Sequence, residues 1–254
     1  MQLTREQFEQ IALLLPRQRG NVRLENFKVV NAILYVAANG CKWRSLPSCY
    51  GHWHSVYMRM SRWGTAGVLN VLAEQLQRLR LKHVPIQVLS LDSTIVKVHP
   101  DGTGAPKKNG PQAIGKSRGG WSTKLHLVAA SARDVLVWSL TPGQAGDAPE
   151  GRQLIQAMGP QQPGQVALLM DNSAYQDNAT RELARQLGFV PVVPPHQKRR
   201  EPWPLDKALY RRRNEVERLF RRLKAWRRVF TRYDKNDIMF AAFITCALIA
   251  ELLR

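Results

Sequence analysis

The stretch Val84-Pro-Ile-Gln-Val-Leu-Ser-Leu-Asp92 is where the sequence changes from a helical pattern to a β-rich one. Its proline interrupts the preceding helical periodicity, and residues 86–91 form a short β-rich run. A second run, Val166 to Met170, is apolar throughout. We expect a strand at each run. Each expected strand ends in a carboxylate, Asp92 in the first and Asp171 in the second.

The segments after this stretch alternate between strand and helix patterns. Residues 101–120 are rich in Gly, Pro, Asn and Lys, which predicts a mobile basic loop. The other expected elements are an antiparallel pair over 121–130 and 135–140, helices over 148–158 and 179–187, strands over 166–170 and 189–193, and a long helix from about 205. This order predicts an α/β fold, with a ribonuclease-H-like mixed sheet and flanking helices.

The charge of the chain is strongly positive. Lys and Arg total 38 against 19 Asp and Glu, which gives a net charge of +19 over 254 residues. The segment from His196 to Lys235 holds 15 Lys and Arg but 5 Asp and Glu, so the excess is concentrated there. Such a balance indicates a polyanionic partner, most economically nucleic acid, although an anionic membrane surface or ribosomal RNA also fits the charge.

Helical periodicity dominates the residues before position 84. Thr4-Arg-Glu-Gln7 has the pattern of a capping box. Further helices are expected over 24–38, 52–63 and 68–81. Short helices with basic, aromatic faces are typical of helix-turn-helix-like modules. We therefore expect two domains, a small all-helical DNA-binding module over 1–83 and a larger α/β domain over 84–254.

Neither a membrane nor a secretory signal is indicated. The beginning of the chain lacks a basic-then-apolar layout, and the apolar run from Ile238 to Leu253 is short for a span and contains Glu251. We expect that run to be a buried helix. Three cysteines suit a reducing cytoplasm without disulfides. There is no Walker loop, so an NTP-driven motor is not expected.

The most informative motif is Tyr210-Arg-Arg-Arg-Asn-Glu-Val-Glu-Arg-Leu-Phe-Arg-Arg-Leu-Lys224. At about 100° per residue, Tyr210, Arg213, Glu217 and Lys224 fall within an arc of roughly 60° on a helix. An adjacent apolar arc can dock on a core; its members are Leu205, Leu209, Val216, Leu219, Phe220, Leu223 and Phe230. Glu215 points about 160° away and is a poor ligand candidate. The alternative is a solvated, salt-bridged helix face.

Asp92, Asp171 and Glu217 together suit metal-assisted phosphodiester chemistry. If the two strands are neighbours, their carboxylates converge at one edge of the sheet, and the docked helix adds the third. Three carboxylates around one or two hard cations are what this chemistry requires. Each Asp alone is better explained as a strand-end or helix cap. Asp147 is expected to be a helix N-cap, with a supporting role at the site as an alternative.

Other side chains suit contact with phosphate. Arg213, Lys224 and Tyr210 are expected to contact phosphates beside the cleaved bond. Lys116, Arg118 and Lys124, which lie around the expected loop, are further DNA-binding candidates. Zinc is a weaker alternative, because the spacing of Cys41, Cys49, His52 and His54 is not a usual finger pattern.

With these residues in place, the chain resembles transposases of the insertion-sequence-five family, which are bacterial DDE enzymes. The similarity spans nearly the whole length. It is carried by Gly40-Cys-Lys-Trp-Arg-Ser-Leu-Pro47, Leu91-Asp-Ser-Thr94, Lys116-Ser-Arg-Gly-Gly-Trp-Ser-Thr-Lys-Leu-His126, Asp171 with Ala174-Tyr175, Pro191-Val-Val-Pro-Pro195, the Tyr-Arg-Glu-Lys signature and Thr231-Arg-Tyr-Asp-Lys235. One departure is Asp171-Asn-Ser-Ala-Tyr175, where the family pattern has Lys and Gly after the Asp.

The resemblance implies a ribonuclease-H-like core in which Asp92, Asp171 and Glu217 bind Mg²⁺, with Mn²⁺ as a substitute and two ions in the site. Arg213 and Lys224 then assist at phosphate. It implies an enzyme that binds the terminal inverted repeats of its own element, cuts the ends and joins the freed 3′-hydroxyl to target DNA. No covalent protein intermediate is needed.

The expected partners are double-stranded DNA and further copies of the chain, as a homodimer or larger assembly on DNA. The expected location is the bacterial cytoplasm, at the nucleoid when bound to DNA. Two other functions remain open: a ribonuclease-H-like nuclease without strand transfer, and a domesticated DNA-binding protein. A basic ribosome-associated protein would not need three spaced carboxylates.

Overall fold

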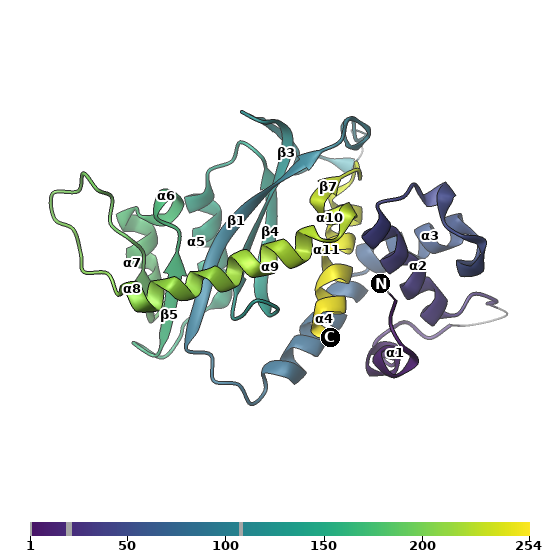
Figure 1. Ribbon diagram of the computed structural model, residues 1–254, viewed down its shortest axis with the longest axis horizontal. Coiled ribbons are helices and arrows are strands. Elements are labelled where there is room, and N and C mark those ends of the chain that lie inside the picture. The colour runs from purple at the N-terminus through teal and green to yellow at the C-terminus, as the bar shows by residue number, and fades with distance from the viewer. Residues whose placement is uncertain (1, 19–21, 107–108) are drawn as a thin grey trace. The chain divides into compact units, whose positions relative to one another are not determined.

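The computed structural model describes residues 2–18, 22–106 and 109–254 (Figure 1). The chain forms two compact units. One comprises Met1–His83, Lys97–Gln112 and Arg222–Arg254, and the other comprises Val84–Val96 and Ala113–Arg221. Each unit is therefore built from segments that are distant in sequence. The division into functional domains at residue 83 remains a prediction.

The described residues form one mixed seven-stranded sheet. Its strand order is β2-β3-β1-β5-β6, with β4 paired to β3 and β7 paired to β1. The strands are β1 (Val88–Val98), β2 (Gly115–Ser117), β3 (Gly120–Ala129), β4 (Val135–Pro142), β5 (Val166–Met170), β6 (Phe189–Val192) and β7 (Thr231–Arg232). Pairs β2/β3 and β3/β4 are antiparallel, whereas β1/β5 and β5/β6 are parallel. This arrangement confirms the predicted ribonuclease-H-like α/β fold.

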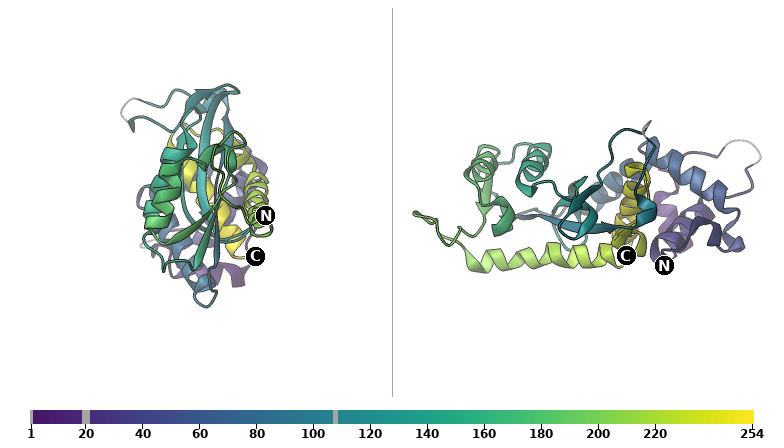
Figure 2. Two further views of the ribbon diagram at one scale, coloured as in Figure 1. Left: turned by 90° about the vertical axis from the view of Figure 1, so that its left-hand side faces the viewer. Right: turned by 90° about the horizontal axis from the view of Figure 1, so that it is seen from above.

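In the unit that holds most of the sheet, helices cover both faces (Figure 2, right). Helices α5 (Asp147–Met158), α6 (Asn172–Tyr175) and α7 (Asn178–Gln186) lie on one face. The other face carries α8 (Lys207–Tyr210), a 3-10 turn over Arg211–Arg213 (η5) and the start of α9 (Asn214–Lys224). The sheet is thus sandwiched between two helical layers.

Strand β5 shows why both faces are apolar. Its alternate residues divide between two core clusters. Val166, Leu168 and Met170 join the cluster on the α5 and α7 side, and Ala167 and Leu169 join the one with Leu205, Leu209 and Tyr210. A strand buried on both faces needs an uninterrupted apolar sequence, which is what this run provides.

The other unit is mainly helical. Its helices are α1 (Arg5–Ala12), α2 (Asn26–Asn39), α3 (Trp53–Thr65), α4 (Val68–Leu81), α10 (Arg227–Phe230) and α11 (Asp237–Leu252), with 3-10 turns over Trp43–Ser45, Ser48–Tyr50 and Pro100–Gly102. Helix α11 packs against α2, α3 and α4, and most of its residues are buried. That central position explains why α11 is apolar on every side. The capping box of Thr4 and Gln7 is also confirmed.

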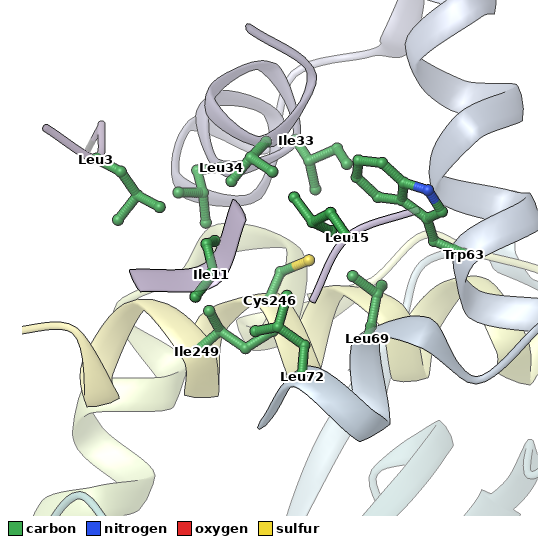
Figure 3. Close-up of a pocket in the computed structure, with 11 residues that line it drawn as sticks. Leu3, Ile11, Leu15, Ile33, Leu34, Trp63, Leu69, Leu72, Cys246 and Ile249 are labelled. Atoms are coloured by element: carbon green, nitrogen blue, oxygen red, sulfur yellow. The ribbon is translucent and has the colours of Figure 1, made fainter. Parts of the chain in front are cut away.

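A small cavity lies in the core of this helical unit (Figure 3). Its volume is about 20 Å³, roughly the space of one water molecule. Its lining is apolar apart from the thiol of Cys246; the residues are Leu3, Ile11, Leu15, Val30, Ile33, Leu34, Trp63, Leu69, Leu72, Cys246 and Ile249. Figure 3 shows the labelled side chains converging from α1, α2, α3, α4 and α11 and from the segments that flank α1. A cavity of this size and lining is a packing defect and offers no ligand site.

Three details differ from the sequence-based expectation. Strand β1 continues to Val98, so Asp92 lies within the strand and not at its end. The expected loop over 101–120 contains the short strand β2, whose pairing with β3 could not be seen locally; Lys107 and Lys108 of that loop lie outside the described residues. The expected long helix is interrupted by the 3-10 turn η5.

The apolar residues of α9 behave largely as predicted. Val216, Leu219, Phe220 and Leu223 are buried, whereas Phe230 is 60% exposed because it lies beyond α9, in α10. Over residues 2–18, 22–106 and 109–254, no helix combines the length and the apolar character that crossing a bilayer requires.

Candidate active site

The parallel pairing of β1 and β5 brings Asp92 beside Asp171. In this register Leu91 lies opposite Met170, so the next residue of each chain segment is an aspartate. Strand β5 ends at Met170, whereas β1 continues past Asp92. The neighbouring strands that the sequence-based hypothesis required are therefore present.

The helical layer places Arg213 and Glu217 on the same side as Asp92. Arg213, in η5, donates through Nη1 to Asp92 Oδ2 at 2.9 Å. Its Nη2 donates to Glu217 Oε1 at 2.7 Å, one helical turn further along. One planar guanidinium therefore joins the carboxylate of the sheet to the carboxylate of α9.

The charges of Asp171 and Glu217 both act on the carboxyl group of Asp92. Burial raises the pKa of Asp92 to about 6; the Ser93 N–H and Arg213 oppose this rise, and the charges of Asp171 and Glu217 add to it. A carboxyl group with such a pKa is costly to ionise unless a cation is near. This donor set, three carboxylates around a partly buried position, matches the oxygen ligands that hard divalent cations prefer.

In the present geometry two of the carboxylates, Asp92 and Glu217, bind the Arg213 guanidinium. Within the described ranges, no three His, Cys, Asp or Glu side chains are grouped as a ready metal-binding set. For Asp92 and Glu217, the contacts with Arg213 account for this arrangement. Over those ranges, Cys41, Cys49, His52 and His54 do not form such a set either.

Tyr210, the last residue of α8, lies near Arg213. The Arg213 guanidinium carbon lies 5.8 Å from the centre of the Tyr210 ring. Burial raises the pKa of Tyr210, with Arg213 opposing and Asp171 and Asp92 adding to the rise. Burial lowers the pKa of Arg213, but Tyr210 and the three acids outweigh it, so the net pKa is raised. The phenol is therefore neutral and the guanidinium charged over the physiological range.

The remaining predicted site residues are placed less uniformly. Lys224 ends α9 in the other compact unit, and burial lowers the pKa of its ammonium. Lys116 lies in β2 and Arg118 in the turn that follows, and both side chains are exposed. Lys124, in β3, is 13% exposed, and its Nζ donates to Asp147 Oδ1 and the Ala145 carbonyl. Its ammonium is thus directed to the interior.

Sequence reasoning missed Ser93 as a participant. Its Oγ donates to Asp147 Oδ1 at 2.9 Å, which joins the residue after Asp92 to the start of α5. The expected N-cap role of Asp147 is wrong, because Gly146 is the N-cap of α5 and Asp147 is its first residue; a supporting role of Asp147 at the site stays a prediction. The alternation of side chains along a strand could have revealed this role. Ser93 lies two residues after Leu91 and four after Leu89, so it points to the same side of the sheet as these buried residues.

The family comparison decides the class of protein. A model described as "Transposase DDE domain" matches residues 84–252, well over half of the chain, and one described as "Putative transposase of IS4/5 family" matches residues 3–73. The chain belongs to the DDE transposases. It is a DDE transposase of the insertion-sequence 4/5 type, an enzyme of DNA cleavage and strand transfer, and membership of this family implies dependence on a divalent metal ion.

Two curated proteins illustrate the likeness. The "Uncharacterized protein y4sN" of Sinorhizobium fredii is 32% identical over 108 residues, 41% of this transposase and 83% of the relative. The "Putative transposase for insertion sequence element IS6501" of Brucella ovis is 28% identical over 130 residues, 50% of this transposase and 97% of the relative.

Solved structures of Mos1 transposase show a more distant likeness. The paired-end complex with the left transposon end is 17% identical, with 72% of this transposase and 62% of that chain covered and a TM-score of 0.29. The pre-cleavage transpososome is 15% identical, with coverages of 82% and 80% and a TM-score of 0.30. Both scores are low, and the family assignment rests on the sequence models.

Proposed function

We propose that this transposase binds the terminal inverted repeats of its own insertion sequence, cuts at their ends and joins the freed 3′-hydroxyl to target DNA. The observation that supports the proposal is the Arg213 guanidinium that joins Asp92 to Glu217, with Asp171 directly after the neighbouring strand β5. These carboxylates can release the Arg213 guanidinium and bind divalent metal ions in its place when a DNA phosphate approaches.

Asp92, Asp171 and Glu217 are the residues that would hold Mg²⁺, as two ions or with Mn²⁺ as substitute. When bound there, the ions supply Lewis acidity to the reacting phosphodiester and its nucleophile. The three side chains would keep the ions in place at the reacting phosphodiester. No side chain is required to form a covalent bond to DNA. Burial beneath η5 and α9 keeps the Asp92 carboxylate largely away from water, with 16% of its side chain exposed.

Arg213 would turn from the carboxylates to a phosphate of the DNA. Its fork geometry suits two phosphate oxygens as well as two carboxylates. Tyr210, beside it, can donate its phenolic proton to a further phosphate oxygen. Lys116 in β2 and Arg118 in the turn that follows would contact the DNA backbone, and Lys224 would do so if its end of α9 approaches DNA.

The helical unit offers a basic hollow for DNA. An open hollow of about 280 Å³ includes Arg17, Arg59 and Arg62 in its lining, next to Trp63. Arg59 is held there by the Leu24 carbonyl, to which it donates at 2.8 Å. Three cations around one depression suit a backbone phosphate, which supports DNA binding by this module.

The basic segment after β6 is anchored and can present its charges in a fixed place. The ring of Trp203 has the guanidinium carbons of Arg181 and Arg199 at 3.3 and 4.4 Å from its centre. Its Nε1 donates to the Val193 carbonyl at 2.7 Å. This segment is proposed to contribute backbone contacts to target or element DNA.

Because both element ends must be held together, the active species would be a homodimer or larger assembly.

Strand transfer is the reaction that tests the proposal. Imperfect inverted repeats that flank the reading frame would supply the sequence of a pre-cut end, which is then incubated with plasmid and Mg²⁺. We expect joined products from the unaltered transposase. Glu217→Gln should abolish them, whereas Glu215→Gln, whose residue pairs with Arg212 at 3.9 Å, should not.

The same experiment separates the alternatives. Cleavage without joined products would favour a ribonuclease-H-like nuclease. Absence of flanking repeats, together with full biological effect of the Glu217→Gln variant, would favour a domesticated DNA-binding protein. Joined products that survive the Glu217→Gln substitution would contradict the assigned carboxylate.

A further inference from the structure

A second acidic centre lies on the opposite face of the sheet from Arg213. Asp147, the first residue of α5, accepts at one oxygen, Oδ1, from Ser93 Oγ and from Lys124 Nζ, each at 2.9 Å. The same ammonium donates to the Ala145 carbonyl at 2.7 Å. Strands β1 and β3 and helix α5 therefore meet at a single carboxylate oxygen.

The surroundings make this centre rigid. His126 is fully buried, with Nδ1 3.8 Å from Asp147 Oδ1, and its Nε2 shares a hydrogen bond of 2.7 Å with Thr141 Oγ1. Burial lowers the pKa of His126, with Asp147 opposing, so the imidazole is neutral. Lys124 is consequently the cation that balances Asp147. Little space remains here, because a Cβ on Gly151 of α5 would lie 2.5 Å from the Tyr175 ring.

The backbone connects this centre to the catalytic carboxylate. Successive residues of a strand point to opposite faces, so Ser93 points to α5 while Asp92 points to Arg213. The N–H of Ser93 donates to Asp92 Oδ1 at 2.7 Å, and Arg213 binds Oδ2. The rotamer of Asp92 therefore depends on where the Ser93 peptide is held.

We infer that Ser93, Asp147 and Lys124 are positioning residues, which fix the Asp92 carboxylate for metal binding through the side chain and peptide N–H of Ser93. The inference rests on the proposed role of Asp92 as a metal ligand. It gives Lys124 a different task from the DNA contact predicted from sequence. Partners that orient a ligand typically change metal affinity by about 10- to 100-fold when removed.

A purely structural role makes a different prediction. If the ion pair of Asp147 and Lys124 serves only to stabilise the fold, removal of the Ser93 hydroxyl should leave metal binding unchanged. Ser93→Ala deletes one oxygen, keeps the ion pair and preserves the peptide N–H. This variant should therefore fold, and it separates orientation of Asp92 from stability of the core.

The test is titration of the transposase with Mn²⁺, with free Mn²⁺ measured by electron paramagnetic resonance. We expect Ser93→Ala to bind Mn²⁺ about tenfold more weakly and Ser93→Thr, which keeps the hydroxyl, to restore binding. Ser139→Ala is the matched control, because its hydroxyl is buried in the same sheet with no hydrogen-bond partner among the described residues. It should bind as the unaltered chain does.

A second measurement uses strand transfer of a pre-cut end as a function of Mg²⁺ concentration. Ser93→Ala should raise the half-saturating Mg²⁺ concentration about tenfold, with a smaller effect on the rate at saturation. Lys124→Met should act in the same direction. Equal Mn²⁺ affinity of Ser93→Ala and the unaltered transposase would overturn the inference, as would failure of Ser93→Thr to restore it.

The outcomes distinguish this inference from the proposed function. If the unaltered transposase joins ends and Ser93→Ala matches it in both measurements, the proposed function stands and the positioning role is wrong. If Asp92→Asn binds Mn²⁺ as tightly as the unaltered chain, the assigned metal ligand is wrong, and the inference that depends on it is wrong too.

Discussion

Asp92 is held in a setting that makes ionisation of its carboxyl group costly. Burial is the main cause of its raised pKa, and the Asp171 and Glu217 charges add to it. Arg213 offsets part of this cost in the present geometry. A residue that lowers the stability of the fold but binds metal is typical of active sites, where activity often requires some loss of stability.

This setting predicts a pH-dependent gain of stability on Asp92→Asn. The pKa of Asp92 is about 6 in the folded chain and 3.8 in the reference state. The contribution of Asp92 to the free energy of unfolding is therefore full below about pH 4 and is lost as the pH rises through 6. Without metal, the variant should be more stable than the unaltered chain at pH 7.5 by about 1–3 kcal/mol, and little changed at pH 4.

Unfolding by denaturant, with a chelator present to remove metal ions, would measure the difference in free energy of unfolding at both pH values. Glu215→Gln is the control for loss of one carboxylate on the exposed helix surface. A loss of stability of the same size at both pH values would contradict the assigned setting of Asp92. Added Mg²⁺ should then stabilise the unaltered chain and not the Asp92→Asn variant.

Arg213 should be irreplaceable by lysine. A guanidinium can bind Asp92 and Glu217, or two phosphate oxygens, at the same time, whereas an ammonium is a single point charge. Arg213→Ala and Arg213→Lys should each slow strand transfer on the order of 100-fold at saturating Mg²⁺. Arg212→Ala, which alters an exposed neighbour, should not. Near-normal rates for Arg213→Lys would show that only charge matters at this position.

At the scale of elements, the site is created by strand pairing. The sequence predicted both aspartates, because each follows an apolar run. It could not show that β1 and β5 are neighbours in parallel register, since this pairing joins residues nearly 80 positions apart. The extension of β1 beyond Asp92 was visible in principle, because Ser93 to Val98 is rich in β-branched residues, but a charged residue inside a strand looks locally like its end.

Other elements were beyond local patterns. Strand β2 has three residues and exists through its pairing with β3. The side chain of Lys124 points to the interior because it binds Asp147, which α5 supplies from a distant part of the sequence. By contrast, α9 was predictable, because its apolar and cationic arcs follow the helical period and its Val216 and Leu219 are fully buried.

Helix α5 provides a prediction at this scale. An alanine is normally favoured over glycine within a helix by about 1 kcal/mol. At Gly151, however, the added Cβ would lie 2.5 Å from Tyr175 and 3.2 Å from Leu91. Gly151→Ala should therefore destabilise the fold by about 1–3 kcal/mol and displace the segment after β5 that carries Asp171.

Thermal unfolding would measure the effect of Gly151→Ala. Gly119→Ala is the matched control, because the nearest atom to its Cβ, Ser117 Oγ, would be 4.0 Å away. It should change the midpoint by no more than a small amount. If Gly151→Ala raises the midpoint, helix propensity has outweighed the contact with Tyr175, and α5 is less closely packed on the sheet than the structure indicates.

At the scale of the whole molecule, the net charge of +19 decides how DNA binding responds to salt. Each cation that neutralises a phosphate releases a counterion, so affinity should fall steeply and linearly on logarithmic axes of salt concentration. The charge thereby supplies affinity for any DNA, and selection of the element ends must come from particular side chains.

Lys116 and Arg118 allow this division to be measured. Both are exposed beside the β2–β3 turn, and neither is part of the carboxylate site. Lys116→Ala and Arg118→Ala should each reduce the slope of log affinity against log salt by about 1, equally for repeat and unrelated duplexes. Fluorescence anisotropy over a series of KCl concentrations would give the slopes.

Arg185→Ala is the control, because its guanidinium pairs with Glu182 at 3.7 Å on α7. Its slope should match that of the unaltered transposase. A loss of affinity at Lys116 or Arg118 that is confined to the repeat sequence would mean that the turn reads bases and does not merely hold phosphates. In that event, end recognition would be shared between the sheet and the helical module, since a phosphate contact cannot distinguish one sequence from another.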